Sequence, residues 1–103
     1  MLVVDVQEKD LGNLKFGKPH NFNYIITNSG DTIITVTKLL LGCQSCTTAS
    51  ISKQVIGVGQ SSSIDVTFTP GSTGIQNKSL IVQYTDSFTQ DQLSLKFKAI
   101  VAK

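Results

Sequence analysis

Apolar and polar residues alternate one by one along several short stretches of this chain, and this alternation is the strongest structural signal in the sequence. It is clearest over residues 22–26, 64–68, 80–84 and 93–99. A period of two residues predicts β-strands with one dry face, because successive side chains of a strand point to opposite sides of the sheet. No stretch has the sustained period of 3.6 residues that predicts a helix.

The stretch from His20 to Thr48 organises the rest of the prediction. Two extended runs, residues 22–26 and 32–37, lie on either side of the segment Asn-Ser-Gly-Asp at 28–31. The asparagine and glycine of this segment tolerate positive φ, so we expect a tight turn. Lys38 interrupts the alternation of the second run, which predicts a β-bulge or a change of sheet near that residue.

Further strands are predicted on both sides of this pair. Residues 2–6 alternate at the N-terminus, a short segment at 14–16 follows Gly12, and residues 49–51 and 55–58 form two short runs. About seven short strands separated by turn residues predict an all-β sandwich or barrel. The length of 103 residues fits one domain, 1–103.

The apolar side of the alternating runs predicts the core. We expect a seven-stranded immunoglobulin-like β-sandwich whose core consists of Phe22, Tyr24, Ile26, Ile34, Val36, Ile64, Val66, Phe68, Leu80, Val82, Leu95 and Phe97.

Charge argues against nucleic acid as the partner. The net charge is only +2, every basic residue is a lysine, and the lysines are scattered along the chain. Base edges and phosphates are usually bound by arginine, so no specific nucleic-acid binding is expected. Apolar runs such as Leu39–Leu41 are far shorter than the ~20 residues of a membrane span.

The N-terminus predicts no secretory signal, because Asp5 interrupts the apolar residues early and no basic flank precedes them. The expected setting is therefore a virion or the cytoplasm, or the periplasm if a signal was removed.

The order of motifs along nearly the whole chain resembles a known family. These motifs are LGNLKFG (11–17), NFNYIITNSGD (21–31), IITV (33–36), CQSCTT (43–48), IDVTFTP (64–70), Gly74 and NKSLIV (77–82). They resemble the immunoglobulin-like group related to Hydin, to the ASH domains of centrosomes and cilia, and to major sperm protein. The most similar members are small bacterial domains of unknown function that carry a cysteine loop after the third strand.

This resemblance implies a seven-stranded β-sandwich that acts as a binding or scaffolding module without catalytic activity. Two positions depart from the family pattern. Cys43 and Cys46 are three residues apart rather than two, and Val58 stands where the family tends to have proline before a glycine. Because of the first departure, no role of the cysteines is carried over from the family.

The segment Cys43-Gln-Ser-Cys46 is the sharpest chemical feature of the chain. A C-x-x-C segment can be a redox pair, half of a metal site or a small disulfide loop. A redox pair usually needs a helix N-terminus to lower the thiol pKa, and structural zinc needs four ligands, neither of which is predicted here. The favoured interpretation is a buried or loop-closing pair with no cofactor; Cys43 and Cys46 are the weak candidates for a metal.

No residue set predicts an enzyme. His20 is the only histidine, and we expect it to point to solvent at the start of a strand, without the oriented acid that a catalytic triad needs. The seven acidic residues form no closely spaced pair on one strand face and no calcium-loop spacing. The glycines lack the spacing of a phosphate-binding loop.

The first strand is the candidate interface. Leu2, Val3, Val4, Asp5 and Val6 are unusually apolar for an edge strand, and an open edge can be extended by a strand of another chain. The alternative, which we favour, is that this strand only packs against its own sandwich.

The predicted function is a non-enzymatic structural or interaction module. Its predicted partner is a protein of a larger assembly, with homo-oligomers included, and the favoured role is an accessory or decoration subunit on a phage virion. The alternative is a bacterial envelope or periplasmic domain in which Cys43 and Cys46 form a disulfide or bind a soft metal such as copper.

Overall fold

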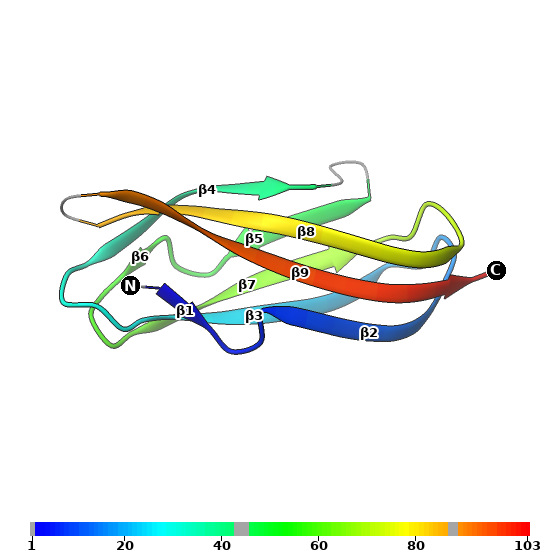
Figure 1. The fold of residues 1–103 in the computed structure, drawn as a ribbon, viewed down its shortest axis with the longest axis horizontal. Coiled ribbons are helices and arrows are strands. Elements are labelled where there is room, and N and C mark those ends of the chain that lie inside the picture. Colours follow the sequence, from blue (N-terminus) through cyan, green and yellow to red (C-terminus); the bar gives the residue numbers. More distant parts are fainter. Residues whose placement is uncertain (1, 43–45, 87–88) are drawn as a thin grey trace.

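Two β-sheets facing each other form this protein. The computed structural model describes residues 2–42, 46–86 and 89–103, which contain nine strands in an elongated body of 47 × 20 × 18 Å (Figure 1). The predicted all-β sandwich is confirmed, whereas the predicted number of seven strands is wrong. Over the described ranges, no helix has the length and apolar character needed to cross a bilayer.

The first sheet has four antiparallel strands and the second has five. In the first, the order is β1 (Leu2–Val4), β3 (His20–Asn28), β7 (Ser61–Phe68) and β5 (Thr47–Ile51). In the second, it is β2 (Glu8–Lys15), β9 (Gln90–Ala102), β8 (Gly74–Thr85), β4 (Ile34–Leu41) and β6 (Val55–Ile56). Among the strands of the described residues, only the β2–β9 pair is parallel.

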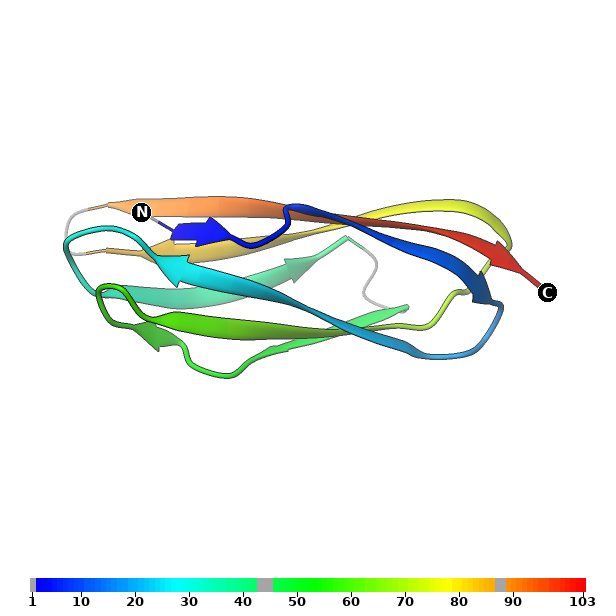
Figure 2. The same cartoon turned by 90° about the horizontal axis from the view of Figure 1, so that it is seen from below.

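The clearest addition to the predicted strands is β2. Its sequence is mostly polar and contains Gly12, so the sequence pattern predicted only a short segment at residues 14–16. The strand forms because β9 lies beside it and supplies hydrogen-bond partners, with a register shift between Asp10 and Asn13 around Gly12 at φ 72°. Figure 2, which faces this flank of the molecule, shows β1 and β2 in succession. Together they carry the N-terminal chain from one sheet to the other.

The core lies between the sheets and agrees with the alternation in the sequence. Eleven of the twelve predicted core residues are buried, and only Phe22 is partly buried, at the margin of the core. Phe97 joins the layers, because its ring centroid lies 5.2 Å from that of Phe68 and 4.9 Å from that of Phe22. Leu2, Ile56, Tyr84, Ala99 and Val101 complete the buried apolar set.

The segment after β3 does not form the predicted hairpin turn. β3 and β4 belong to different sheets, so the chain crosses the sandwich here, and neither Asn28 nor Gly30 has a positive φ. A fully buried Asn28 side chain shapes the crossing instead. Its Nδ2 donates to the carbonyl oxygens of Thr32 (2.8 Å) and Ile56 (3.0 Å), and its Oδ1 accepts from the Gly30 amide (3.0 Å).

The main chain of Asn28 forms hydrogen bonds to a second turn, at residues 57–60. Its N–H donates to the Gln60 carbonyl oxygen and its own carbonyl accepts from the Gly59 amide, both at 2.9 Å. Gly59 has φ 76° and the Gln60 amide donates to the Gly57 carbonyl oxygen, which indicates a type II turn over residues 57–60. Proline is common at the second position of such a turn. Val58 occupies this position, which explains why the family tends to have proline there.

The predicted bulge near Lys38 is confirmed. The register of β4 with β8 shifts between Val36 and Lys38, so Thr37 is an extra residue in β4. Its Oγ1 donates to the Gln83 carbonyl oxygen at 3.2 Å. Because of the extra residue, the side chains after the bulge point to the opposite face from the one they would otherwise occupy. Leu39 and Leu41 therefore pack against the core.

Replacing Phe68 by alanine should lower the free energy of unfolding by about 3–5 kcal/mol, because a buried aromatic ring is removed and a cavity is left. Urea denaturation measures the loss. Phe16→Ala is the matched control, since that ring is half-exposed, and should change stability by less than about 1 kcal/mol. A similarly small loss for Phe68→Ala would contradict the core assignment.

Replacing Asn28 by alanine should cost on the order of 3 kcal/mol, because it leaves the Thr32 and Ile56 carbonyls and the Gly30 amide without their partner. Asn28→Asp keeps the shape and the acceptor but removes both N–H donors, so it should also destabilise strongly. The exposed Asn77→Ala is the control and should stay within about 0.5 kcal/mol of the parent protein in urea denaturation. Equal losses for Asn28→Ala and Asn77→Ala would refute this role.

Candidate interaction surfaces

The N-terminal segment predicted as an interface lies at a sheet edge. β1 pairs with β3 as the outermost strand of the four-stranded sheet, and Leu2 is 4% exposed and part of the core. Val3 and Val6 are exposed. The segment therefore packs onto its own sandwich, as the favoured interpretation required, and its pairing with another chain stays a prediction.

Asp5 lies where the chain leaves the first sheet. Its main-chain N–H donates to the Ile25 carbonyl oxygen (2.9 Å), and its Oδ1 accepts from the Ile25 amide (3.0 Å). Its Oδ2 lies 3.5 Å from Lys9 Nζ. The Asp5 carboxylate therefore accepts the hydrogen bond that the carbonyl oxygen of a neighbouring strand would otherwise accept from β3. The main chain meanwhile turns towards the other sheet. Sequence reasoning assigned Asp5 to the first strand and missed this role.

Asp5 and Tyr24 have shifted pKa values. Partial burial acts to raise the pKa of Asp5, but the amides of Ile25 and Val6 and the charge of Lys9 outweigh it, so the pKa is lowered. Burial, with a smaller contribution from the Asp5 charge, raises the pKa of Tyr24. The Tyr24 hydroxyl donates to the Lys96 carbonyl oxygen at 2.6 Å and so connects β3 to β9. The Tyr24 contact therefore joins the two sheets.

Asp5→Asn should make the protein less stable at pH 7 by a modest amount, since the carboxylate is more than a third exposed and screened by solvent. The folded pKa lies below the unfolded value near 3.8, so the carboxylate stabilises the protein above that pH and loses this effect as pH falls through the folded pKa. Urea denaturation of both proteins at pH 7 and at about pH 3 checks this. A difference that does not shrink in acid would contradict it.

Cys46 directly precedes β5. It is partly buried against the core, its carbonyl oxygen accepts from the Thr69 amide (2.8 Å), and its Sγ lies 3.5 Å from Thr47 Oγ1. Cys43 is outside the described residues, so both the disulfide and the metal interpretation of the pair stay predictions. Within the described ranges, no three His, Cys, Asp or Glu side chains come together as a metal site would require.

His20 does not point to solvent as predicted. It is partly buried at the start of β3 on the same face as Phe22 and Tyr24, and its ring centroid lies 6.3 Å from that of Phe22. Its sheet neighbour Phe68 separates it from Thr47 of β5, the residue that follows Cys46.

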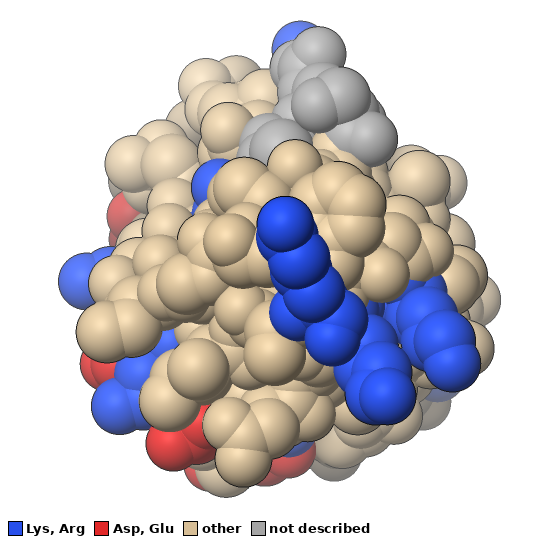
Figure 3. Space-filling model, turned by 90° about the vertical axis from the view of Figure 1, so that its right-hand side faces the viewer, with Lys and Arg blue, Asp and Glu red and all other residues tan. Residues whose placement is uncertain are grey.

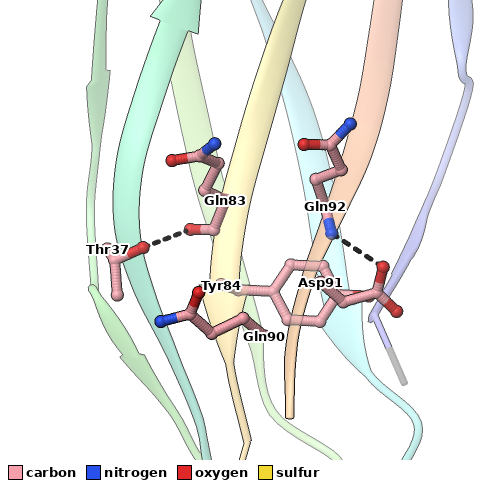
Figure 4. Close-up of a pocket in the computed structure, with 6 residues that line it drawn as sticks. All are labelled: Thr37, Gln83, Tyr84, Gln90, Asp91 and Gln92. Atoms are coloured by element: carbon pink, nitrogen blue, oxygen red, sulfur yellow. Dashed lines mark hydrogen bonds between the residues drawn. The ribbon is translucent and has the colours of Figure 1, made fainter.

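A polar hollow lies beside the bulge of β4, on the five-stranded sheet (Figure 4). It is lined by Thr37, Gln83, Tyr84, Gln90, Asp91 and Gln92. Burial and the Asp91 charge raise the pKa of Tyr84. The three glutamine amides can donate and accept hydrogen bonds, which suits a polar contact. The one sequence feature that could have indicated this hollow is the polar run Gln-Asp-Gln at 90–92. The structure places this run beside Gln83 of the neighbouring strand.

The family model that matches this sequence is "Protein of unknown function (DUF1573)", over residues 2–101. The chain belongs to this family. No curated protein matches the sequence.

Solved structures share the fold of this DUF1573 domain. The Vibrio cholerae VesB protease has a TM-score of 0.84 at 15% identity over 96% of this chain, which spans only 31% of the VesB chain. The ASH/PapD-like domain 7 of human CEP192 has a TM-score of 0.76 at 10% identity, covering 99% of this chain and 85% of that one. WR4, a Caenorhabditis elegans MSP family member, has a TM-score of 0.66 at 16% identity, covering 99% and 98%.

At these identities the similarities establish the fold alone. They confirm the resemblance to immunoglobulin-like domains of the ASH and major sperm protein type. The fold occurs both as most of a chain and as a fraction of an enzyme's chain.

Proposed function

We propose that this domain is a non-enzymatic protein-interaction module that docks onto a larger assembly through the open edge of its four-stranded sheet. One observation carries the proposal. β1 pairs with only Ile26, Thr27 and Asn28 of β3, and β2 joins the other sheet, so most of β3 has no strand on that side.

The hydrogen-bond pattern shows which groups face the open side. Ile25 directs its N–H and carbonyl towards Asp5, away from β7. Residues of an antiparallel strand alternate in this respect, so Asn23 and Asn21 also direct their N–H and carbonyl groups away from β7. No strand of the described chain pairs with these two residues on that side. They form a ready template for one added strand.

The surroundings of this edge suit an extended peptide with alternating apolar side chains. Leu11 and Leu14 of β2 and Phe22 of β3 are only partly buried along this flank. A peptide added beside β3 would place every second side chain against them, and its main chain would bond to Asn21 and Asn23. Main-chain bonds supply affinity in such complexes, and the apolar contacts supply specificity.

Similar structures support a binding role, since the CEP192 domain is described as PapD-like and WR4 belongs to the MSP family. The assembly itself is a further proposal with two forms. In one, the domain is an accessory subunit of a phage virion, associating with further copies or with other virion proteins. In the other, it is a domain of the bacterial envelope or periplasm, where Cys43 and Cys46 form a disulfide or bind a soft metal such as copper.

Panning a library of extended peptides against the protein tests the docking edge. Asn23→Pro removes the N–H that faces the open side and should abolish binding of the enriched peptides, because proline cannot donate to an added strand. Ala49→Pro is the matched control, since by the same alternation its N–H faces the free side of β5, at the opposite edge of the sheet. It should leave peptide binding unchanged.

Circular dichroism and urea denaturation establish that both proline variants are folded. Equal binding by the two variants, or no enriched peptide at all, would remove the support for this edge. Intact mass with and without reductant, together with metal analysis, separates the two settings: a reduced, metal-free protein favours the virion form, and an oxidised or metal-loaded one favours the envelope form.

A further inference from the structure

Three bulky apolar side chains are exposed near the end of the molecule that carries the C-terminus. Phe16 is 51% exposed in the turn between β2 and β3. Ile75 and Ile100 face each other across β8 and β9 and are 73% and 55% exposed. Ile75 and Ile100 are neighbours, and Phe16 lies at the same end of the molecule because its N–H bonds to Ala102, two residues after Ile100. Exposed apolar side chains that lie close together are typical of a surface that contacts something apolar.

The main chain holds Phe16 in place. Its N–H donates to the Ala102 carbonyl oxygen (2.8 Å), and the next amide, that of Gly17, donates to the Pro70 carbonyl oxygen (3.1 Å). The ring lies beside Lys103, Ser72 and Thr73 at an open hollow. These two hydrogen bonds hold the turn in place, and the turn presents the aromatic ring half-exposed rather than in the core.

Lysines surround these apolar groups. Lys15 and Lys18 flank Phe16, Lys103 follows β9, and Lys98 lies two residues before Ile100 on the same face. All four are exposed, and none forms an ion pair with another described residue. Figure 3 looks onto this end and shows blue side chains near its centre, with red ones only towards its left and lower margins.

Acidic groups are concentrated elsewhere. Asp31, Asp86 and Asp91 belong to the turns and strand ends at the opposite end of the molecule. One carboxylate, that of Asp10, lines the same hollow as Ile75, Ile100 and Lys98, so the lysines of this region outnumber its acid by four to one. One corner of the molecule is therefore both apolar and cationic. It consists of Phe16, Ile75, Ile100, Lys15, Lys18, Lys98 and Lys103. We refer to it as the basic apolar corner.

We propose that the basic apolar corner docks onto the surface of a lipid bilayer that contains anionic lipids. The phenyl and isoleucine side chains would enter the boundary between headgroups and acyl chains, while the lysines remain at the level of the phosphates. Each lysine near an anionic surface contributes about 1 kcal/mol, and lysine acts as a point charge that needs no fixed phosphate geometry.

The shape of the corner favours a bilayer over a folded acidic protein. The two shorter extents of the whole molecule are 20 and 18 Å, so either end is small beside a standard protein interface of about 800 Å² on each partner. Phe16 on its turn and the Ile75–Ile100 pair on the strands leave little area for complementary packing by a rigid partner. A fluid lipid surface adapts to these side chains and supplies both the apolar and the anionic environment.

Single-tryptophan variants test the proposal, because the chain has no tryptophan of its own. Phe16→Trp places the reporter in the corner, and Ile33→Trp places a matched reporter at the opposite end, where Ile33 is 58% exposed. With vesicles of phosphatidylcholine and phosphatidylglycerol, the emission of Phe16→Trp should shift to shorter wavelength and be quenched by brominated acyl chains. Ile33→Trp should not respond, and neither variant should respond to pure phosphatidylcholine.

Charge variants test the second half of the proposal. Lys15→Gln/Lys18→Gln should lower the partition coefficient onto anionic vesicles by roughly fivefold per lysine. Lys38→Gln/Lys53→Gln, which has the same net charge but leaves the corner intact, should lower it much less. Circular dichroism establishes folding.

Four outcomes would overturn the proposal. These are no shift for Phe16→Trp, equal shifts for both tryptophan variants, equal effects of the two lysine pairs, or a Phe16→Trp shift that grows with protein concentration without vesicles. The last would mean that a second copy covers the corner. None of them depends on the edge of β3, so this proposal and the peptide-docking proposal succeed or fail separately.

Discussion

The buried side chain of Asn28 is the contact on which the arrangement of the sandwich depends. A chain that crosses from one sheet to the other must leave main-chain groups without strand partners, and buried groups of that kind are costly. Asn28 supplies those partners to Gly30, Thr32 and Ile56, while its own main chain bonds to Gly59 and Gln60. One residue therefore joins the end of β3, the segment before β4, the strand β6 and the turn between β6 and β7.

Asp5 has a related effect at the N-terminus. There the chain also changes sheets, but the residue that permits it lies at the surface and uses a carboxylate to satisfy the Ile25 amide. Because the crossing happens after so short a β1, β3 remains uncovered over most of its length. The proposed docking edge is thus a direct consequence of how early the first strand ends.

The two proposed contact surfaces use different chemistry on one rigid body. The edge of β3 offers main-chain hydrogen bonds with apolar neighbours, which suits an extended peptide. The basic apolar corner offers lysines and three exposed apolar side chains, which suits an anionic lipid surface. A module with both could hold a peptide segment of an assembly close to a bilayer. No reactive group among the described residues is needed for either contact.

The sequence by itself determined the fold class, the faces of the long strands and an irregularity near Lys38, because alternation is a local property that each strand displays along its own residues. Only the tertiary structure decided the partners. β2 exists because β9 lies beside it, and residues 28–31 cross the sandwich rather than forming a hairpin because Asn28 finds acceptors far along the chain. Likewise, Phe16, Ile75 and Ile100 become one surface only after three strand ends meet. Such contacts depend on pairing between distant segments, and the periodicity of a single segment does not record it.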